Sequence, residues 1–354
     1  MKTGIIGLPL VGKTSLFSIL TRAEVNLARR EDRVGVAVVP DSRLDRLGDL
    51  FHPRKLTHAT IELGDVGSLT PESLRDGSGI AALRSVDALA QVVRAFDLES
   101  AAAPAGDVRN LEFDLIVSDL GQVEKRRERV AKDIKNDTKK QRTAALHQEA
   151  DILERMQAHL EAEQPLRTLA LLPQDEKATR GFQFLSQKPI LYLLNVSEAE
   201  APELETAVER HGLHAALRSP NTGATAICAK IEAEIAGLPE ADAAEFLAGY
   251  GLRESGVARV AQAIYRLLGL ISFFTAGEDE CRAWTIPRAT PAVEAAGAIH
   301  TDLSKHFIRA EVIGWQELLE FGSEAAARAQ GKLRLEGKDY IVQDGEVMHI
   351  RHSG

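Results

Sequence analysis

The residues best suited to chemistry form one short run near the start of the chain, Gly7-Leu8-Pro9-Leu10-Val11-Gly12-Lys13-Thr14. The run fits the pattern G-x-x-x-x-G-K-[ST], and it lies between an apolar stretch at residues 4–6 and a helical pattern that begins at Ser15. In such a strand–loop–helix context, backbone N–H groups point at phosphate oxygens and the helix dipole favours negative charge. Lys13 would supply positive charge for the β- and γ-phosphates, and the Thr14 hydroxyl would ligate Mg²⁺. The run therefore predicts a nucleoside triphosphate site rather than an ordinary glycine turn.

A second segment, Asn195-Val196-Ser197-Glu198, follows a strongly apolar run at residues 189–194. It falls where the carboxyl end of a parallel strand would place a ligand. Most GTPases carry Asn-Lys-x-Asp in this position, and the Asp accepts hydrogen bonds from guanine. The carboxylate of Glu198 is one methylene further from the backbone, which spoils a bidentate pair, so we expect poor selectivity for guanine.

Composition limits the class of protein. The chain has 354 residues, 44% of them hydrophobic, and a formal net charge of −9, so we expect two or three folded domains and no overall attraction to nucleic acid. Its two cysteines make neither a disulfide framework nor a metal cluster, which favours a reduced, cytoplasmic protein. The first residues enter a strand pattern at once, and no apolar run approaches about 20 residues, so we expect no signal peptide and no membrane span.

Strand and helix patterns alternate in both halves of the chain and predict an α/β domain with a mostly parallel sheet. Strands are expected at residues 34–39, 59–63, 88–93, 111–117, 190–194 and 224–227, and helices at 41–50, 78–84, 229–236, 241–249 and 255–268. From residue 280 onward short strands dominate, at 281–286, 307–312, 332–335, 340–343 and 347–351, with a helix at 315–321. This last part predicts a smaller mixed α+β domain.

Between Gln122 and Glu163 glycine and proline vanish and charge is dense. The apolar residues recur at helical spacing in a stripe too narrow for a globular core. Two antiparallel helices interrupted near Asn136 would form a projecting arm with a basic first half. The basic residues of that half are Lys125, Arg126, Arg127, Arg129, Lys132, Lys135, Lys139, Lys140 and Arg142. They form either a solvated helix face or a docking surface for an acidic partner.

Taken together, these motifs resemble the YchF family, of the Obg group of P-loop proteins, over nearly the whole chain. The resemblance rests on the P-loop at 7–15, on residues 39–45, on 195–198, on 229–235, and on four C-terminal stretches at 274–277, 282–286, 298–302 and 331–340. It implies a G-domain at 1–121 and 181–270, a helical coiled-coil arm at 122–180, and a β-grasp (TGS) domain at 271–354. It also implies a preference for ATP over GTP, slow hydrolysis, and association with the ribosome, especially its large subunit. The P-loop itself predicts Mg²⁺ as cofactor, and the basic arm offers a contact to RNA.

Several residues depart from the family pattern at catalytic positions. Leu10 replaces an Asn that can help to hold a monovalent cation. Arg29 stands near the Thr of switch I and cannot ligate Mg²⁺, because a guanidinium has no free acceptor. The Asp-x-x-Gly motif becomes Asp65-Val66-Gly67-Ser68, and the apolar Leu69 follows where other G-domains have a water-orienting Gln. We therefore expect nucleotide binding to survive better than hydrolysis.

These arguments define one set of candidate residues. The nucleotide is expected to contact Gly7, Pro9, Leu10, Val11, Gly12, Lys13, Thr14, Ser15, Asn195, Val196, Glu198, Cys228 and Ala229, and Mg²⁺ to contact Thr14 and Asp65. Cys228 replaces a serine, so its backbone N–H and that of Ala229 would have to serve the base. Three functions are consistent with this set: a slow ATPase that regulates ribosomes, a catalytically impaired scaffold on ribosomes or RNA, and a small-molecule kinase. No acceptor-binding signature supports the kinase.

Overall fold

The structure is a computed structural model that describes the chain except residues 23–32, 67–76, 99–102, 137–142, 253 and 354. Within this part, no helix is both long enough and apolar enough to cross a membrane. Contacts between Cα atoms divide the chain into two compact units, one of residues 1–35 and 62–263 and the other of 36–61 and 264–354. This division differs from the predicted domain boundaries. The prediction placed residues 36–61 in the G-domain, whereas their contacts group them with the C-terminal segment.

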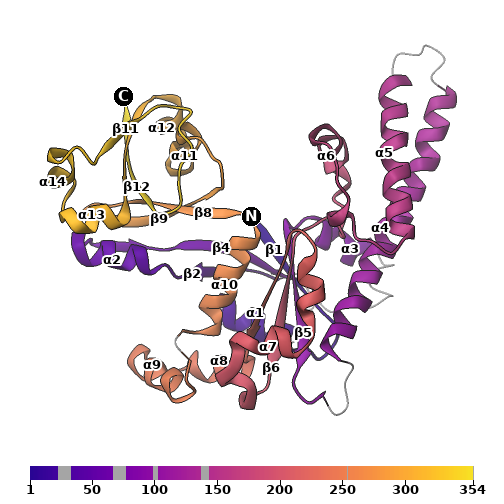
Figure 1. Cartoon of the computed structure of the whole chain (residues 1–354), viewed down its shortest axis with the longest axis horizontal. Helices are drawn as coiled ribbons and strands as arrows, with labels where there is room; N and C mark the ends of the chain where they lie inside the picture. The colour runs from indigo at the N-terminus through magenta and orange to yellow at the C-terminus, as the bar shows by residue number, and fades with distance from the viewer. Residues whose placement is uncertain (23–32, 67–76, 99–102, 137–142, 253, 354) are drawn as a thin grey trace. The chain divides into compact units, whose positions relative to one another are not determined.

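A six-stranded sheet with the strand order β2-β4-β1-β5-β6-β7 forms the centre of the first unit, and its strands β2 and β4 include residues of the second unit (Figure 1). Its strands are β1 (Lys2–Ile6), β2 (Arg33–Val39), β4 (Ala59–Asp65), β5 (Ala88–Ala95), β6 (Ile190–Val196) and β7 (Thr222–Ile227). The pairings β1–β4, β1–β5, β5–β6 and β6–β7 are all parallel. The prediction of a mostly parallel α/β sheet is therefore confirmed.

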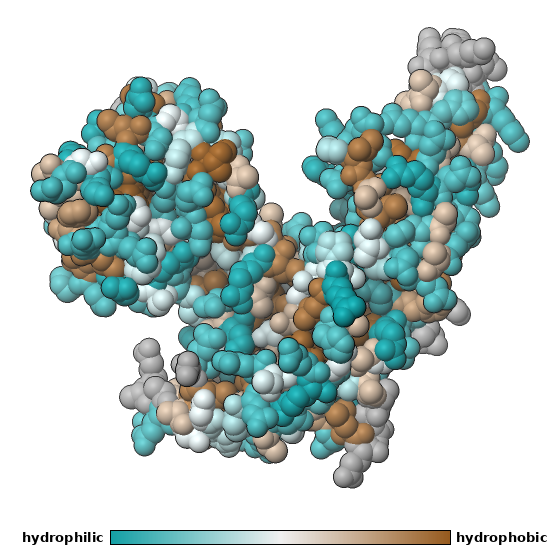
Figure 2. Space-filling model, in the orientation of Figure 1, coloured by the Kyte–Doolittle hydropathy of each residue, from teal (hydrophilic) through white to brown (hydrophobic). Residues whose placement is uncertain are grey.

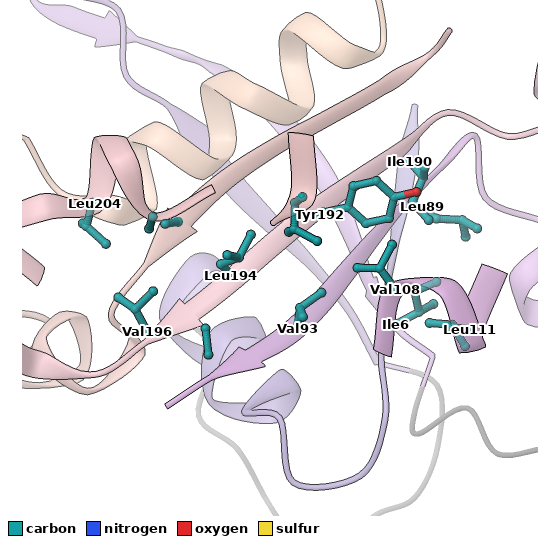
Figure 3. Packing of buried hydrophobic residues seen from close by; sticks show 14 of the residues in the cluster. Ile6, Leu89, Val93, Val108, Leu111, Ile190, Tyr192, Leu194, Val196 and Leu204 are labelled. Carbon is teal, nitrogen blue, oxygen red and sulfur yellow. The ribbon is translucent and has the colours of Figure 1, made fainter. Parts of the chain in front are cut away.

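The helices that accompany these strands lie near the positions that the sequence pattern predicted, except the one at Leu204–Arg210, which it did not predict. They are α1 (Lys13–Thr21), α3 (Gly77–Arg84), α7 (Leu204–Arg210), α8 (Ala229–Ile235), α9 (Glu240–Gly249) and α10 (Gly256–Leu267), the last of which runs from the first unit into the second. Strand β6 is buried along its whole length, because helices cover both faces of a parallel sheet. Figure 3 shows the core that results, with Tyr192 and Leu194 of β6 between Val93 of β5 and Leu204 of α7.

The arm consists of α4 (Pro104–Asn136) and α5 (Thr143–Glu161), which lie side by side (Figure 1). Helix α4 ends at Asn136, as predicted, but it begins at Pro104, so the strand predicted at 111–117 is wrong. Apolar and acidic residues alternate from Leu111 to Leu115 and imitate a strand. The buried set instead follows helical spacing, and it leaves Phe113 47% and Val117 50% exposed.

Buried polar contacts attach the lower half of α4 to the rest of the first unit. The Asp119 carboxylate is fully buried and accepts hydrogen bonds from Leu185 N at 3.0 Å, Ser186 N at 2.7 Å and Ser186 Oγ at 2.7 Å. Arg167 lies in the short helix η2 (Leu166–Thr168) and forms an ion pair with Glu112 of α4, with 2.7 Å between Nη1 and Oε2. Helices α6 (Pro173–Thr179) and η3 (Arg180–Phe182) follow. Because these polar groups are paired, the base of the arm is a fixed part of the fold.

The second unit contains a mixed sheet in the order β11-β10-β12-β8-β9-β3. Its strands are β3 (Lys55–Thr57), β8 (Leu270–Thr275), β9 (Glu280–Pro287), β10 (Phe307–Gly314), β11 (Arg334–Glu336) and β12 (Glu346–His352), and its helices are α2 (Ser42–Phe51), α11 (Ala292–Ile299), α12 (Thr301–Lys305), α13 (Trp315–Phe321) and α14 (Glu324–Ala329). The predicted strand at 340–343 is wrong, because only an isolated bridge from Ile341 to Pro291 forms there. The β-grasp assignment of this unit stays a prediction.

Candidate nucleotide-binding site

The predicted site residues meet at one edge of the first sheet. Strand register places Ile5 beside Asp65, and it places Asn195 beside both Arg94 and Ile227. The strands are parallel, so the segments that leave β1, β4, β6 and β7 all emerge at their carboxyl ends. Open α/β sheets bind their ligands at this edge. The structure therefore brings together segments that lie about 190 residues apart in the sequence.

The loop from Gly7 to Gly12 has a backbone that requires glycine at both of its ends. Gly7 has φ 151°, and a Cβ there would lie 2.6 Å from the carbonyl oxygen of Val92. Gly12 has φ 95°, and a Cβ there would lie 2.5 Å from Nδ2 of Asn195. Leu10 also has a positive φ, of 64°, and is 86% exposed, although Asn adopts this region more readily than Leu does. Both glycines are thus required by the path of the loop.

Lys13 begins α1 and is only 6% exposed. Its Nζ donates a hydrogen bond to the carbonyl oxygen of Leu8 at 2.6 Å, so the side chain folds back along the loop. Burial lowers the pKa of Lys13 to about 8, against the opposing attraction of Asp65. A buried ammonium group with one hydrogen bond to a neutral acceptor is a poorly compensated charge, and a phosphate would compensate it.

Asn195 locks the loop to the strand that carries the base segment. It is 5% exposed, its Nδ2 donates to the carbonyl oxygen of Val11 at 3.1 Å, and its Oδ1 accepts from Ala229 N at 3.0 Å. One amide therefore joins the segments after β1, β6 and β7. The prediction assigned Asn195 and the N–H of Ala229 to contact with the nucleotide, and in the structure these two groups bond to each other.

Glu198 lies at the open side of the site. Its carboxylate pairs with Nζ of Lys230 at 2.6 Å, and the two side chains are 39% and 66% exposed. Val196 is buried at the end of β6 and its side chain packs into the core. Lys230 was not among the predicted site residues, although it directly follows Ala229. The only sequence signal for Lys230 was its place next to Ala229, whose backbone N–H was a predicted contact.

Cys228 precedes α8 and is buried, 2% exposed. Burial raises the pKa of its thiol, which makes it a poor nucleophile. Of the remaining predicted residues, Pro9 of the loop and Ser15 of α1 are exposed.

The two predicted Mg²⁺ ligands suit that ion by chemistry and position. Thr14 lies in the first turn of α1, and Asp65 ends β4 beside the loop and attracts Lys13 electrostatically. A hydroxyl and a carboxylate next to a phosphate cradle match the oxygen ligands that Mg²⁺ takes, with phosphate oxygens and water completing its shell. The predictions for Arg29, Gly67, Ser68 and Leu69 lie outside the described residues.

The parallel sheet, the glycine cradle ahead of α1 and the buried lysine define a P-loop protein. The comparisons with known proteins agree. A family model described as "YchF-GTPase_C: Protein of unknown function (DUF933)" matches residues 270–353. The ribosome-binding ATPase YchF of Bacillus subtilis is 37% identical, over 99% of this chain and 99% of its own. The Obg-like ATPase 1 of Oryza sativa is 32% identical, over 99% of this chain and 92% of its own.

A solved structure gives the same result. The YchF GTPase of Schizosaccharomyces pombe superposes with a TM-score of 0.86 and 29% sequence identity, covering 99% of this chain and 97% of its own. The chain belongs to the YchF family. The names of these relatives disagree about the nucleotide, since some are called ATPases and one a GTPase.

Proposed function

We propose that the chain binds ATP at the carboxyl edge of the first sheet and hydrolyses it slowly. The observation that carries the proposal is the cradle between Gly7 and Lys13, whose two glycines admit no side chain and whose lysine is buried with an incompletely compensated charge. Its relatives are named ATPases, which supports the same nucleotide. When it is bound, Mg²⁺ would be held by Thr14 and Asp65 and would neutralise charge on the phosphates.

The base segment supports adenine over guanine, with GTP binding more weakly. Guanine recognition needs a carboxylate that accepts two hydrogen bonds from the N1–H and the N2 amino group. The longer side chain of Glu198 is displaced from that geometry, and its carboxylate already pairs with Lys230. Asn195 fixes the loop instead of competing for the base.

Slow hydrolysis follows from the sequence departures at Arg29 and Ser68, which change the usual switch groups, and from Leu69, which is apolar as in the family and leaves no water-orienting Gln. A single-turnover assay with Mg²⁺-ATP tests this, and we expect a rate below about 10⁻² s⁻¹, in the range of unassisted P-loop proteins. A rate typical of motor ATPases would contradict the proposal. Complete absence of turnover, with ATP binding retained, would favour the catalytically impaired scaffold.

Ribosome association is the second part of the proposal, with the large subunit as the expected partner. Relatives over the full length are named ribosome-binding. The arm offers exposed cations on α4, whereas Arg126 and Arg127 pair with Glu149 and Glu154 of α5 and hold the two helices together. Co-sedimentation with separated ribosomal subunits at rising salt tests this. Binding should decrease steeply with salt, because contacts to phosphates release counterions. Salt-independent binding would contradict a role for the arm.

A further inference from the structure

A cavity of about 900 Å³ lies at the base of the arm. It is lined by the C-terminal half of α3, by residues 114–129 of α4, and by η3 with the residue after it. We call it the arm-base cavity. All of its walls belong to the first unit, and helix α3 lies beside the lower part of α4 (Figure 1). Its volume is that of sites that hold small organic ligands.

The walls of the arm-base cavity are strongly basic in an acidic chain. Arg84, Lys125, Arg126 and Arg129 line it, against the single carboxylate of Asp114 among the lining residues. The whole chain carries a formal net charge of −9, so this concentration of cations is local. Fields of one sign in a concave surface attract ligands of opposite charge.

Among the described residues, Lys125 and Arg129 lack ion-pair partners, whereas Arg84 is attracted to the buried carboxylate of Asp119. Arg126 pairs with Glu149 at 2.7 Å and is committed to the arm. Within the ranges that the structure describes, Lys125 and Arg129 make no ion pair, and the buried Nε–H of Arg84 has no hydrogen-bond acceptor. Lys125 and Arg129 are also four residues apart on α4, so their side chains leave the same face of the helix. A buried donor without an acceptor is costly, and an anionic oxygen would satisfy it.

The cavity also has an apolar, aromatic side. Phe182 of η3 lines it and lies beside Phe184, with 5.4 Å between ring centroids. Val117 of α4, which is 50% exposed, lines it too. A flat ring against Phe182 with phosphates toward Lys125 and Arg129 would use both kinds of wall, as phosphorylated heterocycles do elsewhere.

We propose that the arm-base cavity is a second binding site, separate from the P-loop, for the phosphate groups of a phosphorylated molecule. Lys125, Arg129 and the guanidinium of Arg84 contact the phosphates, and Asp114 weakens binding by repulsion. The phosphates belong either to a free phosphorylated small molecule or to a nucleotide of an RNA strand. The proposal stands on the cavity alone and does not require ATP to bind the P-loop.

The test uses the full-length chain with Lys13→Ala, which removes phosphate binding at the P-loop. The two probes are inorganic tripolyphosphate and a twelve-nucleotide single-stranded RNA. Arg129→Ala and Lys125→Ala should each weaken binding of the probe roughly three- to tenfold, and Asp114→Asn should strengthen it. Lys305→Ala and Lys338→Ala, which remove exposed lysines outside both the arm and the cavity lining, are the controls and should leave the affinity unchanged.

The probe that binds identifies the source of the phosphates. Binding of tripolyphosphate with these variant effects supports a small-molecule site, and the same effects with RNA alone support a strand. The proposal is overturned if neither probe binds, if the two control variants weaken binding as much as the cavity variants, or if Asp114→Asn has no effect. Far-ultraviolet circular dichroism of each variant separates lost binding from lost folding. Because ATP binding is measured on the chain with Lys13 intact, failure of one site does not imply failure of the other.

Discussion

The two ends of the nucleotide site are built differently. At the phosphate end, Lys13 and Asn195 are buried, and their polar atoms bond to carbonyl and N–H groups of the backbone. At the base end, Glu198 and Lys230 form an ion pair that is largely open to water. Buried polar groups held by hydrogen bonds to the backbone specify one geometry, whereas exposed ion pairs contribute little and rearrange easily.

This difference indicates how affinity and selectivity are divided in the chain. The affinity for phosphate comes from backbone geometry that few substitutions tolerate. The choice of base depends on side chains that a substitution can alter without disturbing the fold. Substitutions at the phosphate end should therefore change affinity for all nucleotides together, and those at the base end should change only the ratio between nucleotides.

The largest effect is expected from Lys13→Ala. Removing the ammonium group deletes charge-assisted hydrogen bonds to the β- and γ-phosphates, so the affinity for ATP should fall about 100-fold or more. Binding of a fluorescent ATP analogue measures this, with Lys132→Ala on the arm as the control for loss of a lysine elsewhere. Full affinity in the Lys13→Ala chain would refute the site.

Asn195→Ala should come next. It leaves the carbonyl of Val11 and the N–H of Ala229 without partners in a buried place, at a cost of about 1–3 kcal/mol in the free energy of unfolding. Urea denaturation measures the stability, and the affinity for ATP and GTP should fall by the same factor. Asn195→Asp keeps the acceptor for Ala229 N but sets a buried carboxylate against the carbonyl oxygen of Val11, so it should not recover the stability that Asn195→Ala loses. An Asn195→Asp chain as stable as the unmodified chain would contradict the role of the Nδ2 donor.

Affinity for ATP should also depend on pH through Lys13. Its pKa of about 8 in the chain without ligand lies below the usual 10.5, so the side chain is charged below pH 8 and increasingly neutral above it. Phosphate binds the charged form, and above pH 8 binding must first add a proton. The dissociation constant should therefore be flat below pH 8 and rise by about tenfold per pH unit above it. A constant that is flat to pH 10 would show that Lys13 keeps an ordinary pKa.

The smallest effects belong to the base end. Glu198→Asp shortens the side chain by one methylene toward the geometry that guanine requires, and it should raise the ratio of GTP to ATP affinity roughly threefold to tenfold. Lys230→Ala frees the same carboxylate without moving it and should change both affinities by less than about threefold. Titration calorimetry with both nucleotides resolves these ratios. If Glu198→Asp lowered the affinity for both nucleotides equally, Glu198 would belong to the phosphate end of the site and would not choose the base.

The sequence predicted what depends on local patterns. It predicted the loop from Gly7 to Thr14, the strand before Asn195 and the end of α4 at Asn136, because each depends on residue types at fixed spacing. Residues 111–117 were misread, because alternation over a few residues imitates a strand while the buried face repeats every three to four residues.

Long-range features could not be predicted in this way. Residues 36–61 group with the C-terminal segment because β3 pairs with β9, more than 200 residues further along the chain. The bonds from Asn195 to Val11 and Ala229, and the pair of Lys230 with Glu198, depend on strand register. No local pattern reports which side chains two distant strands place together.

Isothermal titration of the unmodified chain with ATP, ADP and GTP in the presence of Mg²⁺ tests the division between the two ends most directly. Because the phosphate end supplies the affinity, ATP and ADP should both bind tightly to the P-loop site. GTP should bind to the same site more weakly, because its base finds no bidentate partner in Glu198. Tight binding of GTP together with no binding of ATP would contradict this division and the adenine preference that follows from it.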